Sequence, residues 1–429
     1  MPGDVTTERR DVETFQLDIR AQNTLVVCLL LFGGIVLFYV SYLFRFYYGA
    51  VILILAYLAY TTAGSKSPPY SYASIVTACF SYLALSIAWS PIQSESVYRT
   101  SVDFIYFLFV LFPILAAYCT EDVKFRMLQA ASVAHCCTAI VALLTLGDFV
   151  DPTRGPIRTT YGVIFLASIP SHVYLISRHK SALSVAALVA IFVIGLQLGN
   201  RTLLIFGPPM LLASIVVAAR QQIRTSRSLQ YLLGGAILAL PFVAIAASQL
   251  DLGRAYQRVT NATSFEVGRE VLREQLDPGS RADRERLIST YVSITTFLAH
   301  PLIGGGYGSS PYFVRQVSTF ETPAHGLPFM LLGETGLVGT LLFSTAIYLA
   351  LRGYWRRLRR YPPPDERSRV WFELLTLSGV LLIGVAHQIY EDIYFFIFLG
   401  TGLYYGYCDR RRAGVVMRTP KFSPAASVG

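Results

Sequence analysis

Arginine and histidine side chains gather in the one long polar stretch of an otherwise apolar chain, residues 248–323, and just beyond it. The stretch holds Arg286 and His300, and it leads into Thr322-Pro323-Ala324-His325. Arginine stays charged and offers a planar fork of donors to phosphate oxygens. Histidine, with an unperturbed pKa of about 6.5, can accept a proton near neutral pH. A basic, histidine-bearing loop of this kind predicts chemistry where the chain re-enters the membrane.

The composition of the chain is typical of a polytopic membrane protein. Of 429 residues, 54% are hydrophobic and 14% are charged, and the mean hydropathy is +0.50. An ordinary soluble domain carries about 25% charged residues. The apolar residues form runs close to the roughly 20 helical residues that cross a bilayer core, without the alternation of a barrel. About twelve such runs are expected, over 24–44, 47–63, 72–89, 101–119, 129–147, 159–177, 182–199, 201–219, 231–247, 325–351, 370–388 and 392–408.

The lysines and arginines predict the orientation of these runs. With both termini cytoplasmic, 23 basic residues fall in cytoplasmic segments and five in the short outer loops. The long loop counts little in this rule, so the bias puts it on the extracytoplasmic side. The net charge of +10 is then mostly inner-surface arginine. Such charge favours anionic membrane lipids as partners and gives no support for binding nucleic acid.

The expected fold is therefore an all-α membrane bundle with one large inserted loop. Its parts are a cytoplasmic segment at 1–23, a first transmembrane bundle at 24–247, an extracytoplasmic (periplasmic) loop at 248–323, the last transmembrane helices at 324–408 with a cytoplasmic basic hinge at 352–369, and a cytoplasmic tail at 409–429.

Within the loop, apolar spacing predicts short helices over 265–276 and 283–299. The second helix should end at Pro301 and the glycines that follow it. The cluster Gly304–Gly308 has no preceding strand and no following Lys-Ser/Thr, so it indicates a permissive backbone rather than a nucleotide loop.

The order and spacing of these elements resemble one protein family. Arg286, thirteen further residues and then His300-Pro301-Leu-Ile-Gly-Gly-Gly look like the periplasmic loop of the O-antigen ligase and polymerase superfamily. His325 followed after ten residues by Gly-x-x-Gly, with Glu334-Thr-Gly inside, resembles that superfamily's loop-to-helix junction, and Asn200-Arg201-Thr202 is similar to its Ser-Arg-Thr element. The resemblance covers the chain from about Trp89 onward. One departure is Gly326, where the family usually has Asn, Ser or Gln.

The resemblance implies an enzyme that moves a saccharide from undecaprenyl pyrophosphate to an acceptor hydroxyl. The site would face the periplasm at the bacterial inner membrane. It implies His325 as the base, Arg201, Arg286 and Arg158 as ligands of the donor pyrophosphate, and supporting roles for Glu334 and His300. The leaving group is already good and the sequence offers no carboxylate cluster for a metal. A metal-independent glycosyltransferase without a cofactor is therefore expected.

Each of these residues also has a purely structural interpretation. Arg201 fits an interfacial snorkelling arginine, and Arg286 fits a helix-surface charge. His325 fits a capping or interfacial histidine, and His300 fits a residue that shapes the turn before a proline. Glu334 lies inside an expected membrane helix, where an acid is costly, so it should face inward and orient a partner.

Alternative functions also remain open at this point. A ligase would use lipid A-core as acceptor, whereas a polymerase would join lipid-linked repeat units into O-antigen, capsule or exopolysaccharide. The two share their donor chemistry, and the motifs do not separate them. A transporter or flippase would instead show broken or charged helices at mid-membrane and symmetric halves.

Overall fold

The computed structural model describes residues 24–37, 49–54, 56–57, 74–111, 123–146, 155–197, 201–221, 281–317, 326–360, 362–386 and 393–416. Within these ranges the regular elements are all helices and no strand occurs. The prediction of an all-α fold is confirmed for this part of the chain. The predicted helix over 265–276 and the predicted span over 231–247 lie outside the described residues.

From residue 74 onward, the described ranges contain twelve helical elements. They are α3 (Ser74–Ser86), η2 (Ile87–Trp89), α4 (Gln93–Leu111), α6 (Val123–Leu146), α7 (Gly155–His179), α8 (Ala182–Gln197), α9 (Arg201–Gln221), α13 (Arg281–Ala299), α14 (Ser310–Val317), α15 (Leu327–Arg359), α16 (Pro364–Ala386) and α17 (Ile393–Val416).

Most bounds agree with the apolar runs, and three differ in an informative way. The helix α4 begins at Gln93, eight residues before the expected run, so its first turns are polar. The helix α15 continues through the basic segment to Arg359, and α16 begins at Pro364, so the connection between them is far shorter than 352–369. The helix α17 likewise extends past residue 408 to Val416. Arginine is a good helix former, so a run of arginines lengthens a helix that an apolar run began.

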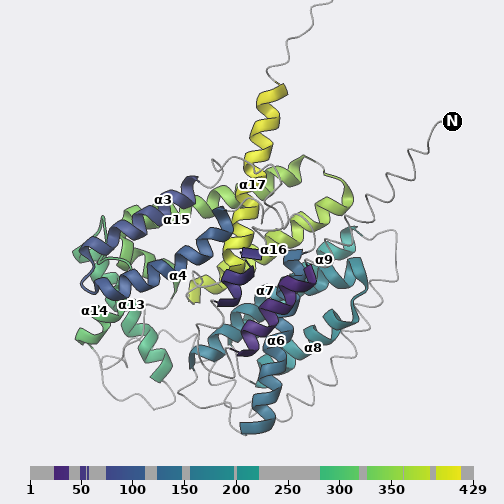
Figure 1. Ribbon diagram of the computed structural model, residues 1–429, viewed down its shortest axis with the longest axis horizontal. Helices are drawn as coiled ribbons and strands as arrows, with labels where there is room; N and C mark the ends of the chain where they lie inside the picture. The colour runs from purple at the N-terminus through teal and green to yellow at the C-terminus, as the bar shows by residue number, and fades with distance from the viewer. Residues whose placement is uncertain are drawn as a thin grey trace, which may run out of the picture.

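The longest helix, α15, has 33 residues and is the one helix in the described ranges that is both long and apolar enough to cross a membrane. Shorter apolar helices, including Thr24–Leu37 and Ala182–Gly195, accompany it. Figure 1 shows α13 and α14 at one side of the molecule, α8 and α9 at the other, and α17 rising between them. Contacts of α15 with α3, α13, α16 and α17 join the two sides.

Ion pairs define one end of this arrangement. They join Arg178 to Asp365, Arg357 to Glu366, and Lys124 to Glu373. The pairs bring together the last turns of α7 and α15, the beginning of α6 and the first half of α16. The beginnings of α7 and α15 therefore lie at the opposite end of the bundle. All three basic residues belong to segments for which the sequence predicts a cytoplasmic position.

Candidate functional site

The site is built around a break in α15. Gly336 has φ 62° and ψ −162°, so the helix is interrupted there. The N–H groups after the break turn to another segment: Leu337 donates to the carbonyl oxygen of Pro301 at 2.9 Å, and Val338 donates to that of Leu302 at 3.1 Å. The loop that follows α13 thus takes up hydrogen bonds that the helix gives up.

The same loop also donates hydrogen bonds to the helix. The N–H of Gly305 donates to the carbonyl oxygen of Gly333 at 2.9 Å, and that of Gly306 donates to the carbonyl oxygen of Glu334 at 2.9 Å. Backbone hydrogen bonds in both directions lock residues 301–306 against the break. The loop and the first part of α15 therefore form one rigid unit.

Glycine is required in this loop because the backbone is left-handed and closely packed. Gly304, Gly306 and Gly308 have φ of +68°, +96° and +77°, which side chains disfavour. A Cβ on Gly306 would also lie 2.6 Å from the Cα of Ser90. The glycine cluster is thus a conformational requirement, as its sequence context predicts.

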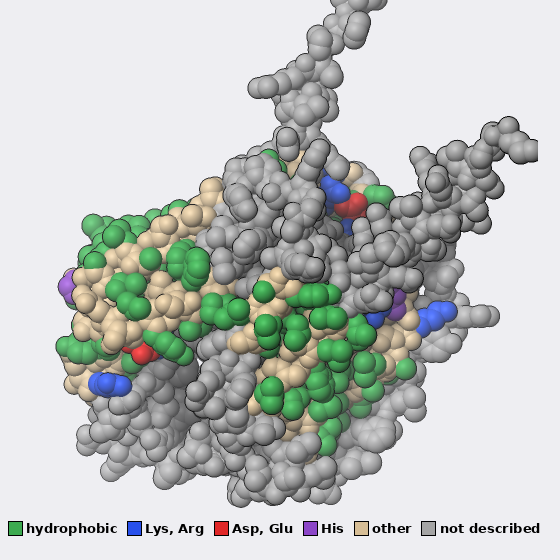
Figure 2. Space-filling view, in the orientation of Figure 1, with side chains coloured by type: hydrophobic (Ala, Val, Ile, Leu, Met, Phe, Trp, Pro, Cys, Tyr) green, Lys and Arg blue, Asp and Glu red, His purple; other side chains and the backbone are tan. Residues whose placement is uncertain are grey.

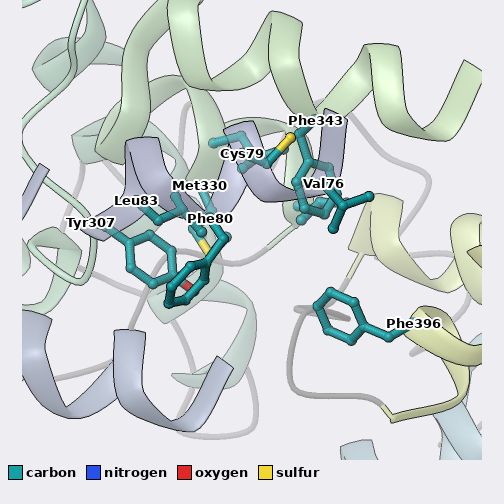
Figure 3. Close-up of a pocket in the computed structure, with 10 residues that line it drawn as sticks. Val76, Cys79, Phe80, Leu83, Tyr307, Met330, Phe343 and Phe396 are labelled. Atoms are coloured by element: carbon teal, nitrogen blue, oxygen red, sulfur yellow. The ribbon is translucent and has the colours of Figure 1, made fainter. Parts of the chain in front are cut away.

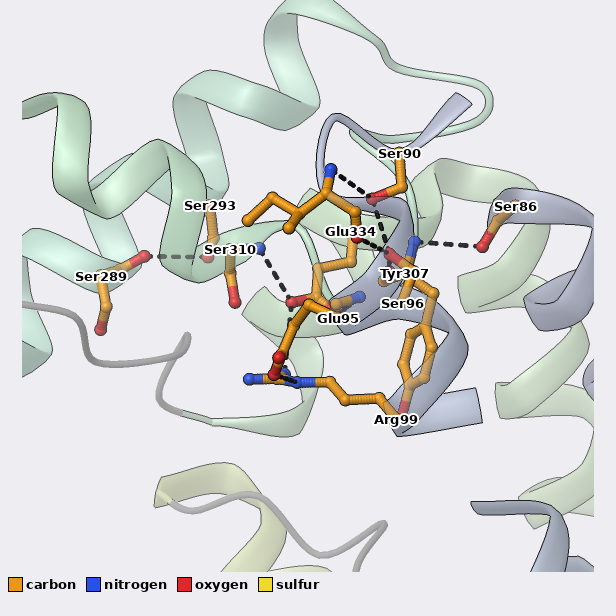
Figure 4. A network of polar contacts seen from close by, with 12 residues as sticks. Ser86, Ser90, Glu95, Ser96, Arg99, Ser289, Ser293, Tyr307, Ser310 and Glu334 are labelled. Atoms are coloured by element: carbon orange, nitrogen blue, oxygen red, sulfur yellow. Dashed lines mark hydrogen bonds and ion pairs between the residues drawn. The ribbon is translucent and has the colours of Figure 1, made fainter. Parts of the chain in front are cut away.

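Glu334 holds the next turn of the loop through its carboxylate. It is 1% exposed, and its Oε2 accepts the N–H of Gly308 at 2.9 Å while its Oε1 accepts the N–H of Ser310 at 3.2 Å (Figure 4). Arg99 approaches Oε1 to 4.0 Å and donates from Nε to Glu95 at 3.1 Å. Turns that point backbone N–H groups into one concavity bind anions. Here the anion is the protein's own carboxylate.

The helices α3 and α4 hold the loop from its other side. The N–H of Tyr307 donates to Ser86 Oγ at 3.0 Å, and its carbonyl oxygen accepts Ser96 Oγ at 2.5 Å. Ser96 Oγ also lies 2.6 Å from Ser90 Oγ (Figure 4). The sequence interpretation did not single out these serines or Arg99. The available signal was a cluster of serines between two apolar runs, which has no meaning until its partners, more than 200 residues away, are known.

An apolar pocket lies beside this loop. It is small, with a cavity volume of about 30 Å³, and α3, α15 and α17 supply its walls together with Tyr307. Figure 3 shows the side chains that line it, among them Phe80, Met330, Phe343 and Phe396. Its lining surface is entirely apolar, so a hydrocarbon ligand is the chemistry that it suits.

The helix α13 packs along the first turns of α15, and both run in the same direction. A Cβ on Gly333 would lie 2.9 Å from the Cα of Ser293, so these residues face one another. Further along both segments, Pro301 faces Leu337 through the hydrogen bond described above. These pairs set the register of the two segments: Ser293 to Pro301 is eight residues and Gly333 to Leu337 is four, and both advance in the same general direction.

This register relates two of the predicted site residues. Arg286 lies seven residues before Ser293, and Gly326 lies seven residues before Gly333. At about 1.5 Å of rise per helical residue, both positions belong to the same end of the pair. His325 is the neighbour of Gly326 in the sequence but lies outside the described residues. The structure describes the backbone position of Arg286.

The two remaining predicted arginines belong to another part of the bundle. Arg158 lies in the first turn of α7, and Arg201 is the first residue of α9; the structure describes their backbone positions. The ion pairs put the beginning of α7 at the same end of the bundle as the beginning of α15. In Figure 1, however, α9 and α13 lie on opposite sides of the molecule, so the structure does not bring Arg201 next to Arg286.

His300 occupies the turn between α13 and the loop. Its N–H donates to Thr296 at 2.9 Å, its carbonyl oxygen accepts the N–H of Gly304 at 2.8 Å, and the residue is exposed. Its backbone therefore continues the end of α13 into the glycine turn. No group of three or more His, Cys, Asp or Glu residues stands in metal-binding geometry among the residues described.

Comparison with known protein families and curated proteins found no match, so any function must be argued from the residues of the site described above. No protein-family model matches the chain, and no curated protein matches it.

Proposed function

We propose that this chain is a membrane glycosyltransferase that moves a saccharide from undecaprenyl pyrophosphate to an acceptor hydroxyl at the outer face of the bacterial inner membrane. The observation that carries the proposal is the parallel docking of α13 on the start of α15. It supports a common site for Arg286 and His325, two residues that are 39 positions apart in the sequence. The apolar lining of the small pocket beside the loop supports contact with one part of a hydrocarbon tail.

In the proposed reaction the acceptor oxygen attacks the anomeric carbon of the donor sugar. The bond from that carbon to the pyrophosphate breaks, and its electron pair leaves with the diphosphate. His325 takes the acceptor proton, and Arg286 offsets the charge that develops on the leaving group. Attack opposite the leaving group inverts the anomeric centre.

The charge pattern of α15 supports a position at a membrane boundary. No charged residue occurs from Thr335 to Leu351, a stretch of 17 residues between Glu334 and Arg352. That stretch is about 26 Å long as a helix, close to the roughly 30 Å of a bilayer core. If α15 spans the membrane, the broken turn and its loop lie at the outer surface, where a lipid-linked donor presents its pyrophosphate.

The ion pairs at the other end support the same orientation. Lys124, Arg178 and Arg357 come from three segments that the positive-inside rule puts in the cytoplasm, and all three meet acidic residues of α16. An all-α bundle of about twelve spans with an outer site is the arrangement that we propose from these features.

The acceptor distinguishes two versions of this function. Transfer to lipid A-core would make the chain an O-antigen ligase, and transfer to another lipid-linked glycan would make it a polymerase. The pocket and the loop concern the donor, which both reactions share. We propose the ligase as the first version, from the His325-to-Gly339 spacing.

The break in α15 is one feature that a transporter would also show. It occurs in the first third of the helix, and the glycine loop fills it with four backbone hydrogen bonds. A break closed in this way suits a fixed site better than a helix that must rearrange during transport. A translocation assay remains part of the test for this reason.

The test is a transfer assay with the full chain in nanodiscs, an undecaprenyl-pyrophosphate-linked glycan and purified lipid A-core. We expect His325→Ala and Arg286→Ala each to lower the transfer rate at least about 100-fold, in the range for loss of a positioned acid-base group. Arg286→Lys should recover part of that loss because it keeps the charge without the fork. The matched control is Arg315→Ala, an exposed arginine of α14, which should stay close to wild type.

Full transfer by both alanine variants would contradict the catalytic assignment. Glycan polymers formed without lipid A-core would identify a polymerase. Movement of donor between the leaflets of proteoliposomes without formation of a glycosidic bond would identify a transporter. Loss of activity on addition of a chelator would contradict the metal-independent mechanism.

A further inference from the structure

The helix α13 exposes an apolar face although its sequence belongs to the long polar stretch. Tyr291, Ile294 and Leu298 are all exposed, and Leu298 has 70% of its surface free. Leu302 and Ile303 of the following turn continue the face, with Leu302 64% exposed. Large contiguous apolar patches on a protein surface mark an interaction site. The question is which partner covers this one.

Its position next to α15 answers that question. Backbone hydrogen bonds join Leu302 directly to Val338, and Leu337, Val338 and Leu341 are themselves exposed on α15. The apolar surface therefore continues without interruption from the end of α13 onto the helix that is long and apolar enough to span a membrane. In Figure 2, hydrophobic side chains are spread over the lobe that carries α13 and α14, with few charged side chains among them.

The exposed apolar residues of α15, which begin with Leu337, Val338 and Leu341, form a stripe along the helix. The far end of this stripe has the chemistry of a membrane interface. Tyr348, Arg352, Trp355 and Arg359 follow one another on the exposed face. The guanidinium of Arg352 lies 6.0 Å from the ring of Tyr348, and that of Arg359 lies 5.2 Å from the ring of Trp355. Aromatic rings and snorkelling arginines concentrate where a helix leaves the hydrocarbon core. This belt marks the inner boundary of the stripe.

The outer end of the exposed apolar surface of α15 lies beside the end of α13. The uncharged stretch from Thr335 to Leu351 covers about 26 Å, close to a typical hydrocarbon core of about 30 Å. The end of α13 and residues 301–303 lie level with the outer end of that stretch, because Pro301 and Leu302 bind Leu337 and Val338. Their exposed apolar side chains therefore lie at the same level as the outer end of the exposed surface of α15.

We infer that the exposed face of α13 and residues 301–303 are set into the outer leaflet and contact lipid acyl chains. The inference rests on the proposed membrane placement and deepens it. The long loop is then not wholly in water: its helix α13 and the glycine turn belong to the membrane boundary. The hydrogen bonds to the break in α15 hold the site at the depth of the lipid headgroups, where a lipid-borne pyrophosphate can reach it sideways from the bilayer.

The experiment is photo-crosslinking of the full chain in proteoliposomes of phosphatidylethanolamine and phosphatidylglycerol. Benzoylphenylalanine replaces Leu298, Leu302, Leu341 or Gln316, one at a time, and adducts are identified by mass spectrometry. Leu341 of α15 is the positive control for lipid contact, and Gln316 of α14 is the matched polar, exposed control. We expect phospholipid adducts at Leu298, Leu302 and Leu341, and at least about fivefold fewer at Gln316, because benzophenone reacts with the C–H groups that surround it and acyl chains displace water there.

The outcomes separate this inference from the proposed function. Lipid adducts at Leu341 together with protein adducts, or none, at Leu298 and Leu302 would overturn the inference and leave the spanning helix intact. An absence of lipid adducts at Leu341 would overturn the membrane placement and the inference with it. Equal lipid labelling at Gln316 would show that α14 is immersed as well, and would overturn the assignment of a lipid-facing side to α13 alone.

Discussion

The two ends of the bundle each bury a carboxylate, and they hold it in different ways. At the proposed outer end, Glu334 accepts two backbone N–H groups of the glycine loop, with Arg99 at 4.0 Å. At the other end, Glu373 is paired with the buried Lys124 and lies 3.6 Å from Arg369 Nε. One carboxylate therefore holds a loop, and the other holds a lysine of α6 and an arginine one turn away on its own helix, α16.

The outer cluster (Glu334, the loop N–H groups and Arg99) and the inner cluster (Glu373, Lys124 and Arg369) should therefore have different roles. Backbone N–H groups cannot change rotamer, so a carboxylate that binds them fixes the path of a particular turn. A buried ion pair between helices fixes their relative position, and its energy depends on both charges being present. The outer cluster should therefore control the geometry of the site, and the inner cluster the stability of the bundle.

The largest expected effect comes from breaking the inner pair. In Glu373→Leu, the fully buried Lys124 loses its carboxylate, and loss of one partner from such a pair costs about 3–5 kcal/mol. We expect a clear fall in the melting temperature of the purified protein in detergent. The double variant Lys124→Met/Glu373→Leu should recover most of that loss, because the buried Lys124 charge is removed together with its partner, whereas the side chain of Arg369 is 21% exposed and can be solvated. A single variant as stable as wild type would show that the pair does not hold the helices.

A smaller effect, confined to the loop, is expected at the outer end. In Glu334→Gln the amide oxygen can accept the N–H of Gly308 or of Ser310, but the charge and one acceptor are lost. Leaving a buried donor unsatisfied costs about 1–3 kcal/mol. We expect faster hydrogen exchange at residues 304–310, with a melting temperature close to that of wild type.

Transfer by this variant should fall about tenfold, since about 1.4 kcal/mol corresponds to a factor of ten in rate. Glu95→Gln is the matched control, because it removes a carboxylate beside Arg99 that accepts no loop N–H in the hydrogen bonds described. Exchange that speeds up equally throughout α15 and α16 would contradict a local role for Glu334.

The smallest expected effect comes from a solvent-exposed ion pair, which tests whether burial is needed for an ion pair to stabilise the inner end. Arg178 and Asp365 also form an ion pair at the inner end, but their side chains are 46% and 71% exposed. Solvent screens such a pair, which is worth about 0–1 kcal/mol. Arg178→Ala should therefore leave the melting temperature nearly unchanged. A loss as large as that of Glu373→Leu would mean that ion pairing alone, without burial, stabilises this end.

Local features of the fold followed well from the sequence. The predicted helix over 283–299 is found as Arg281–Ala299, and it ends just before Pro301 as expected. Apolar spacing and proline act over a few residues, so their effects can be read locally. The early start of α4 at Gln93 was missed because its first turns are polar. Those turns are held by tertiary contacts such as that of Ser96 with Tyr307, rather than by an apolar run.

The partners of the site were not predictable in the same way. Glu334 was expected to face inward and orient a partner, and an arginine is indeed near it. Its main partners are the N–H groups of Gly308 and Ser310, which every residue type other than proline could offer. Backbone groups carry no sequence signal, so only their arrangement in space reveals them.

By itself, the sequence determined an all-α chain rich in membrane-length apolar runs, a strongly uneven distribution of arginine, and a glycine turn after α13. These features follow from hydrophobic period, charge and backbone permissiveness, which are properties of single residues and short segments. The tertiary structure decided that the glycine turn fills a break in α15, that a buried glutamate closes it, and that α13 runs parallel to the start of α15. These depend on close approach between segments far apart in the chain, where one added methyl group or one residue of register would change which atoms meet.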